Sequence, residues 1–196
     1  MKNYRNCRLC PRNCGADRTA GEQGFCRMPD KPIVAKAMIH KGEEPIIMGE
    51  RGTGAIFFSG CSLRCSFCQN HEISYGAVGV EAKDLRKTID SLIEQGAESI
   101  DLVTPSHYLP HILEALTPKL PVPVVYNCGG YESVESLKQL EGLVDVYLPD
   151  LNIPIMKLLC VCPKPQIILK SLLPPFGKCT DRQAHIELKV ESCKKG

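Results

Sequence analysis

The sequence lacks a strong net charge and any long apolar run. Its 24 lysines and arginines nearly balance 22 aspartates and glutamates, which leaves a formal net charge of +2 over 196 residues. This small net charge does not indicate a basic surface that would bind nucleic acid or an anionic membrane. No apolar run approaches the roughly 20 residues that a spanning helix needs. The start, MKNYRNCRLCPRNCG, lacks the apolar region of a secretory signal. We therefore expect a cytoplasmic protein without nucleic-acid or membrane partners.

Cysteine, in contrast, is abundant, with 12 in the chain. The cytosol keeps thiols reduced, so clustered cysteines there indicate metal binding or redox chemistry more often than disulfides. Most of the cysteines fall into two groups. The first group is Cys7, Cys10, Cys14 and Cys26, and the second is Cys61, Cys65 and Cys68.

Apolar strands alternate with amphipathic helices through the middle of the chain. We predict strands at 55–58, 99–103, 121–126 and 144–148, and helices at 81–96, 106–116 and 131–142. This alternation indicates βαβ units and a parallel sheet. The chain is too short for a closed eight-stranded barrel, which typically takes about 250 residues. The predicted fold class is therefore α/β, an incomplete parallel (β/α) barrel, or partial TIM barrel.

The chain divides into three regions. Residues 1–32 form a cysteine-rich segment that cannot bury a core of its own and needs a metal to hold it. Residues 33–151 form the partial barrel, and 33–50 suggest strands or an extended lead-in. Residues 152–196 are a divergent tail, with strands suggested at 166–169 and 185–190 but no clear amphipathic helix between them.

Polar residues stand just past the four predicted strands. They are Ser59, Thr104, Asn127 and Asp150. Active sites of parallel α/β proteins lie at the carboxyl ends of strands. Turns are polar for other reasons too, so turn capping is an open alternative. The second cysteine group leaves from the carboxyl end of the first strand, which favours a site there.

The spacing C-x3-C-x2-C of Cys61, Cys65 and Cys68 has three interpretations. The cysteines could be structural, on one helical face. They could bind zinc with His71 as the fourth ligand. We favour an iron–sulfur cluster, because the segment follows a strand and a glycine and has no helical apolar stripe. A cubane cluster usually has four thiolate ligands, so three leave one iron open to a small chelating molecule.

This motif, with Phe67 before its last cysteine, resembles the signature of the radical S-adenosylmethionine (SAM) superfamily. The blocks HKGEEP, FFSGCSLRCSFCQNHEIS, LVTPSH, VVYNCGGY and VDVYLPD resemble the branch related to the pyruvate formate-lyase-activating enzymes. The resemblance runs from about residue 5 to 151, and the tail does not match.

The resemblance implies that Cys61, Cys65 and Cys68 hold a [4Fe–4S] cluster whose fourth iron is chelated by SAM. One electron would then cleave SAM to a 5′-deoxyadenosyl radical, which abstracts hydrogen from a substrate. The resemblance also implies a flavodoxin- or ferredoxin-like electron donor. Contacts to SAM or substrate are expected at Thr104, His107, Asn127 and Asp150. Relatives have a Gly-rich motif where this chain has VTPSH.

The first cysteine group, spaced C-x2-C-x3-C-x11-C, supplies the four thiolates of a closed metal site. Zinc and a second iron–sulfur cluster fit this spacing almost equally. The cluster is slightly favoured because the relatives are redox proteins. Four unligated cysteines are the third interpretation.

Three functions agree with these patterns. The first is a radical SAM enzyme that installs a glycyl radical on, or otherwise modifies, a protein substrate. The second is a radical SAM enzyme that acts on a small molecule. The third is a non-catalytic iron–sulfur or zinc protein, because the tail after residue 151 suggests that the second half of the barrel is lost. A divergent tail, or a partner chain, could instead complete the SAM pocket.

Overall fold

A single open sheet of six strands organises the chain in the computed structural model, which describes residues 4–43 and 45–149. The strands are β1 (Ile33–His40), β2 (Thr53–Phe58), β3 (Val80–Glu81), β4 (Ile100–Val103), β5 (Val124–Cys128) and β6 (Val146–Pro149). Their order is β3-β1-β2-β4-β5-β6. The four strands from β2 to β6 in this order are parallel, while β1 and β3 pair antiparallel at one edge. The predicted α/β class and parallel strands are confirmed, and the sheet as a whole is mixed.

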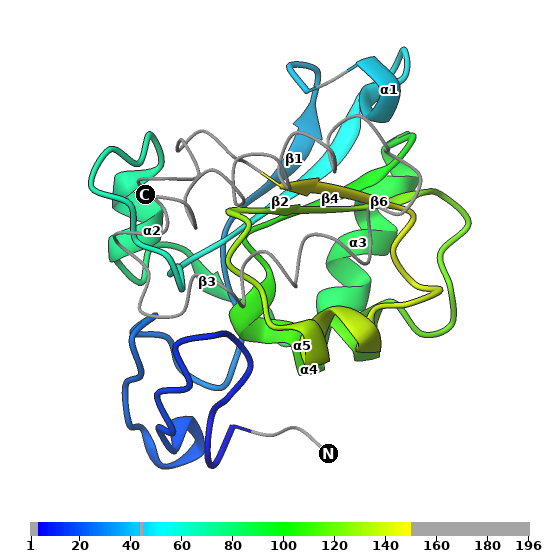
Figure 1. The fold of residues 1–196 in the computed structure, drawn as a ribbon. Helices are drawn as coiled ribbons and strands as arrows, with labels where there is room; N and C mark the ends of the chain where they lie inside the picture. The colour runs from blue at the N-terminus through cyan, green and yellow to red at the C-terminus, as the bar shows by residue number, and fades with distance from the viewer. Residues whose placement is uncertain (1–3, 44, 150–196) are drawn as a thin grey trace, which may run out of the picture.

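The longer helices cover one face of this sheet. The α-helices are α1 (Pro45–Met48), α2 (His71–Tyr75), α3 (Leu85–Glu94), α4 (Leu109–Ala115) and α5 (Val134–Gln139), and the 3-10 turns are η1 (Arg18–Ala20) and η2 (Ser106–Tyr108). Figure 1 shows α3, α4 and α5 on the same side of the strands. These three lie within the predicted helical ranges, but each is shorter. In the described part of the chain, no helix combines the length and apolar character that crossing a bilayer requires.

Alternation along the strands decides which side chains meet the helices. Successive side chains of a strand point to opposite faces of the sheet. Ile56, Leu102 and Tyr126 share one row across β2, β4 and β5. They belong to the same buried cluster as Ile89 of α3 and Ile112 of α4. The helix-covered face is therefore the main core.

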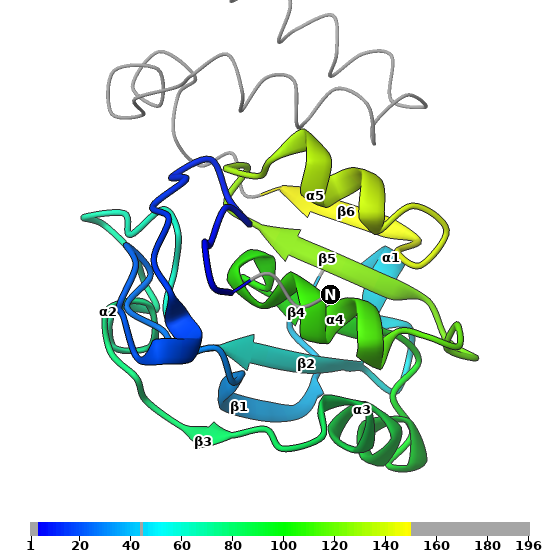
Figure 2. The same ribbon diagram turned by 90° about the horizontal axis from the view of Figure 1, so that it is seen from below.

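The opposite face carries a different set of side chains. One row across β2, β4 and β5 consists of Ala55, Asp101 and Val125. Two residues further along the strands, Asn127 of β5 faces the same way. This face therefore brings a carboxyl and an amide together near the carboxyl ends of the parallel strands. Figure 2 shows that β2, β5 and β6 point toward the side where α2 and the blue N-terminal segment lie.

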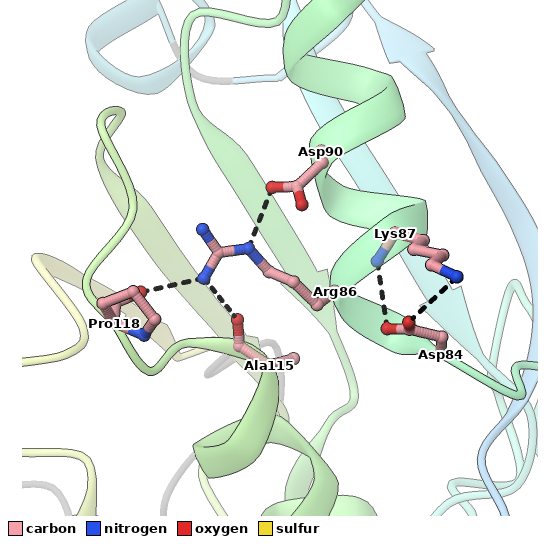
Figure 3. Close-up of polar contacts among 6 residues, drawn as sticks. All are labelled: Asp84, Arg86, Lys87, Asp90, Ala115 and Pro118. Carbon is pink, nitrogen blue, oxygen red and sulfur yellow. Dashed lines mark hydrogen bonds and ion pairs between the residues drawn. The ribbon is translucent and has the colours of Figure 1, made fainter.

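Polar contacts fix α3 and connect it to the end of α4 (Figure 3). The Asp84 side chain caps the helix by accepting from the Lys87 N–H at 3.2 Å. Arg86 Nε lies 2.9 Å from Asp90 Oδ1, one helical turn away. Arg86 Nη1 donates to the carbonyls of Ala115 and Pro118 at 3.3 and 2.9 Å. One arginine thus joins α3 to the chain that leaves α4.

Replacing Arg86 with leucine is expected to lower the free energy of unfolding by about 1–2 kcal/mol, because two carbonyls lose their charged donor. Lys87→Leu is the matched control on the same helix. The Lys87 side chain is 84% exposed and lies 3.7 Å from Asp84, so its loss should cost about 0.5 kcal/mol or less. Urea unfolding followed by circular dichroism measures both. Equal effects of the two substitutions would contradict the role given to Arg86.

Some of the remaining predictions fall on residues that the structure describes and others do not. Asp150 and the tail at 152–196, with the suggested strands at 166–169 and 185–190, lie outside the described residues. The lead-in at 33–50 contains β1 and α1. Residues 4–32 have little regular structure apart from η1, in agreement with the absence of periodicity there.

Candidate functional site

The three cysteines of the second group lie in the loop that joins β2 to α2. The segment 59–70 contains no helix, so the interpretation of a helical face of structural cysteines is wrong. Gly60 begins the loop with a φ of 78°. A Cβ at this position would lie 2.3 Å from Met28 Cγ and 2.8 Å from the Cys26 carbonyl. Glycine is therefore required where the loop passes the N-terminal segment.

The three cysteines of this loop are neither fully buried nor fully exposed. Cys61, Cys65 and Cys68 are all half-buried. The Leu63 N–H donates to Cys61 Sγ at 3.3 Å, and Cys68 Sγ lies 3.3 Å from Ser74 Oγ. Burial raises the pKa of the Cys61 thiol, although backbone N–H donors oppose this shift. A thiolate at Cys61 is therefore favoured when a cation is bound beside it.

Two of the predicted strand-end residues lie next to each other. Thr104 follows β4, and its N–H donates to the Asn127 carbonyl in β5 at 2.8 Å. Thr104 has a φ of 57°, which is an outlier for a β-branched residue. Such strain persists only where the surrounding structure holds it, and it clusters at functional sites. Thr104 and Asn127 are both half-exposed, so a ligand could reach them.

Asp101 is a candidate that we did not predict from the sequence. Its residue is fully buried in β4, and its Oδ2 accepts from Asn127 Nδ2 at 3.4 Å. Within the described residues, its Oδ1 has no hydrogen-bond partner. Burial raises the pKa of Asp101 to about 7, and Glu43 adds to the rise. The sequence feature that could have identified Asp101 is a carboxyl inside the apolar run SIDLV, where a buried polar group needs a partner.

The imidazole of His107 lies beneath the cysteine loop. Its ring is buried, and Nε2 lies 2.7 Å from the Ser59 carbonyl, to which it donates. Burial lowers the pKa of His107 to about 3, and the Arg18 charge adds to this effect. The ring is therefore neutral and supports the first residue of the loop. Its predicted contact with SAM or substrate stays a prediction.

The N-terminal segment holds the loop from the other side. Arg12 Nε donates to the Ser62 carbonyl at 3.0 Å, and Nη2 donates to the Leu63 carbonyl at 3.4 Å. Its guanidinium lies 3.8 Å from the centre of the Phe25 ring and 5.2 Å from that of Tyr131. The segments that carry the two cysteine groups are thus joined by direct contacts, which their separation in the sequence did not reveal.

The loop offers three thiols that could hold either a single ion or an iron–sulfur cluster. Among residues 4–43 and 45–149, no group of three or more His, Cys, Asp or Glu side chains is arranged to hold a metal ion. A zinc ion binds sulfur at about 2.3 Å, which requires its sulfurs to lie close together. A cubane cluster binds each cysteine through a separate iron and tolerates a wider spread. Cys61, Cys65 and Cys68 supply three thiols from one short loop, with an N–H donor already directed at one sulfur.

Comparison with known proteins gives one informative similarity. The chain is 31% identical over 159 residues to the uncharacterized protein MJ0674 of Methanocaldococcus jannaschii. The alignment covers 75% of this chain and 45% of that protein, so the chain spans less than half the length of this relative. No family model matches the chain. No solved structure matches it either.

Proposed function

We propose that this chain is a radical SAM protein in which Cys61, Cys65 and Cys68 hold a [4Fe–4S] cluster. When bound, the cluster and SAM supply a 5′-deoxyadenosyl radical that abstracts hydrogen from a substrate. The observation that carries the proposal is the position of three half-buried cysteines on one loop. That loop leaves the carboxyl end of a parallel strand, where α/β proteins bind their ligands.

The arrangement of the helices supports a partial barrel as the frame of this site. The strands β2, β4, β5 and β6 follow one another in chain order, and α3, α4 and α5 cover one face (Figure 1). A doubly wound sheet has helices on both faces, whereas a barrel has them only outside. The face with Asp101 and Asn127 would then line the inside of the barrel.

Residues near the loop have distinct roles in the proposed site. Thr104 and Asn127, at neighbouring strand ends, would contact SAM with polar groups. Asp101 would accept a hydrogen bond from the SAM amino group. His107 and Arg12 would position the loop through the carbonyls of Ser59 and Ser62. A flavodoxin- or ferredoxin-like protein would supply the electron.

Anaerobic reconstitution of the full chain with iron and sulfide tests this function. After reduction with dithionite, we expect SAM to change the electron paramagnetic resonance (EPR) spectrum, because only a cluster with an iron free of protein ligands can bind it. We also expect release of 5′-deoxyadenosine, measured by chromatography. The unreduced protein with SAM is the control and should release none. A reduced cluster that neither responds to SAM nor cleaves it would contradict the proposal.

A further inference from the structure

A buried arginine lies beside the first cysteine group, and none of the described residues gives it a carboxylate partner. Arg18 is 1% exposed. In the described part of the chain, no ion pair within 4.0 Å includes Arg18; its Nε donates to the Met28 carbonyl at 3.0 Å, and it also donates to the Pro29 carbonyl. Nη1 donates to the His107 carbonyl at 2.6 Å and lies 3.8 Å from Cys7 Sγ.

Neutral carbonyls and aromatic rings only partly offset the cost of burying this charge. The Tyr4 and Tyr108 rings lie 4.6 and 5.3 Å from the Arg18 guanidinium carbon. Buried charges in proteins are normally paired with an opposite charge. The thiol of Cys7, which can become negative, lies 3.8 Å from Arg18 Nη1. The position of Arg18 therefore indicates a negative centre at the first cysteine group.

Tight turns bring the cysteines of this group together. The Asn13 N–H donates to the Cys10 carbonyl at 3.1 Å, and the Gly15 N–H donates to the Cys7 carbonyl at 3.0 Å. Asn13 and Gly15 have φ values of 47° and 71°, which permit these turns. Cys14 Sγ lies 3.8 Å from the Cys7 carbonyl, and a Cβ on Gly24, two residues before Cys26, would lie 2.6 Å from Cys14 Sγ. All four cysteines thus lie in one small region.

We propose that Cys7, Cys10, Cys14 and Cys26 bind a metal centre through four thiolates, separate from the loop site, and that Arg18 offsets its negative charge. Four thiolates with one Zn²⁺ have a net charge of −2, and four thiolates on a [4Fe–4S]²⁺ core have the same charge. Both centres are therefore anions whose charge the Arg18 guanidinium would offset. Positively charged groups and N–H donors around a metal centre raise its affinity and hold its ligands.

The four sulfurs must turn toward one another for this binding. Within residues 4–43 and 45–149, no three His, Cys, Asp or Glu side chains are arranged to hold a metal ion. Cys7, Cys10 and Cys26 are buried, whereas Cys14 is exposed. A Cβ on Gly24 would lie 2.6 Å from Cys14 Sγ, so this sulfur now rests against the Gly24 backbone. Cys14 Sγ already lies 3.8 Å from the Cys7 carbonyl, so it is close to one of the other three cysteines.

Metal analysis of full-length variants tests the inference separately from the proposed function. The triple variant Cys61→Ser, Cys65→Ser, Cys68→Ser removes the thiols of the loop and keeps the first group. We expect it to retain about one zinc per chain, or about four irons with four sulfides. The identity of the metal decides between the two centres. A triple variant without bound metal would overturn the inference, whatever the wild-type chain does with SAM.

Two single substitutions then assign the site. Cys14→Ser changes an exposed residue and should remove the metal that the triple variant retains; unchanged metal content would overturn the assignment. Arg18→Leu should speed metal release to a chelator by roughly 10–100-fold, the range for residues that support metal ligands. Arg18→Lys keeps the charge and should release metal more slowly than Arg18→Leu. Arg5→Leu is the matched control, because Arg5 is exposed on the same segment, and should release metal at the wild-type rate.

Discussion

Cys65→Ser is expected to abolish SAM cleavage and the response of the reduced EPR spectrum to SAM. Cys65 lies between the other two cysteines of the loop, so its loss would leave the proposed cluster two thiolates, too few to hold it. We expect a fall in 5′-deoxyadenosine release of roughly 100-fold or more, since loss of a ligand should exceed the 10–100-fold effect of residues that only support ligands.

Ser66→Ala provides a matched control for this substitution. Ser66 is the next residue in the same loop and is exposed, so the variant should keep its iron, sulfide and SAM response. Circular dichroism should show the same secondary structure for both variants, since Cys65 is half-buried in a loop. The EPR response to SAM is the deciding measurement, because iron bound by Cys7, Cys10, Cys14 and Cys26 would have no open position. A Cys65→Ser protein that still responds to SAM would contradict the assignment of this ligand.

The sequence predicted those parts of the fold that have a periodic pattern. Strands β2, β4, β5 and β6 are mostly apolar, and α3 has buried Leu85, Ile89 and Leu92 on one face. The antiparallel pairing of β1 was not predicted, because the apolar character of a strand does not reveal the direction of its partner. Helices α1 and α2 have four and five residues, which is too short for a helical period to appear.

The site was predictable only where chemistry follows from residue type and local spacing. Cysteine spacing identified the loop, and the ends of apolar runs identified Thr104 and Asn127, which lie together. The contacts of Arg12 with the loop join residues about 50 positions apart, and nothing in the local sequence indicates them. Asp101 was missed because a single acidic residue in an apolar strand was interpreted as part of the strand alone.

Asp101→Asn should raise the free energy of unfolding at neutral pH. The carboxyl has an ordinary pKa of 3.8, and burial raises its pKa to about 7 in the folded protein. Between these values the folded state binds more protons than the unfolded state, so the free energy of unfolding falls as pH rises. Above pH 7 the loss reaches about 4 kcal/mol, since each pKa unit is worth about 1.4 kcal/mol.

The asparagine should remove this loss, because it is uncharged and close to aspartate in shape. The stabilisation by Asp101→Asn should therefore be largest near pH 8, shrink as pH falls and vanish near pH 4. Urea unfolding at several pH values measures this trend. The control is Asp90→Asn, whose side chain is 46% exposed in its pair with Arg86 and whose effect should stay below about 1 kcal/mol throughout.

A carboxyl that costs this much folding free energy should serve binding. Asp101 Oδ1 accepts no hydrogen bond from the described residues, and the proposed ligand has an amino group that could donate one. Hydrogen bonds to charged groups contribute about 1.5–3 kcal/mol, so Asp101→Asn should weaken SAM binding by roughly 10–100-fold. Equilibrium dialysis on the reconstituted protein measures this affinity at pH 8, where the variant is expected to be the more stable protein. Unchanged affinity together with higher stability would show that Asp101 does not contact SAM.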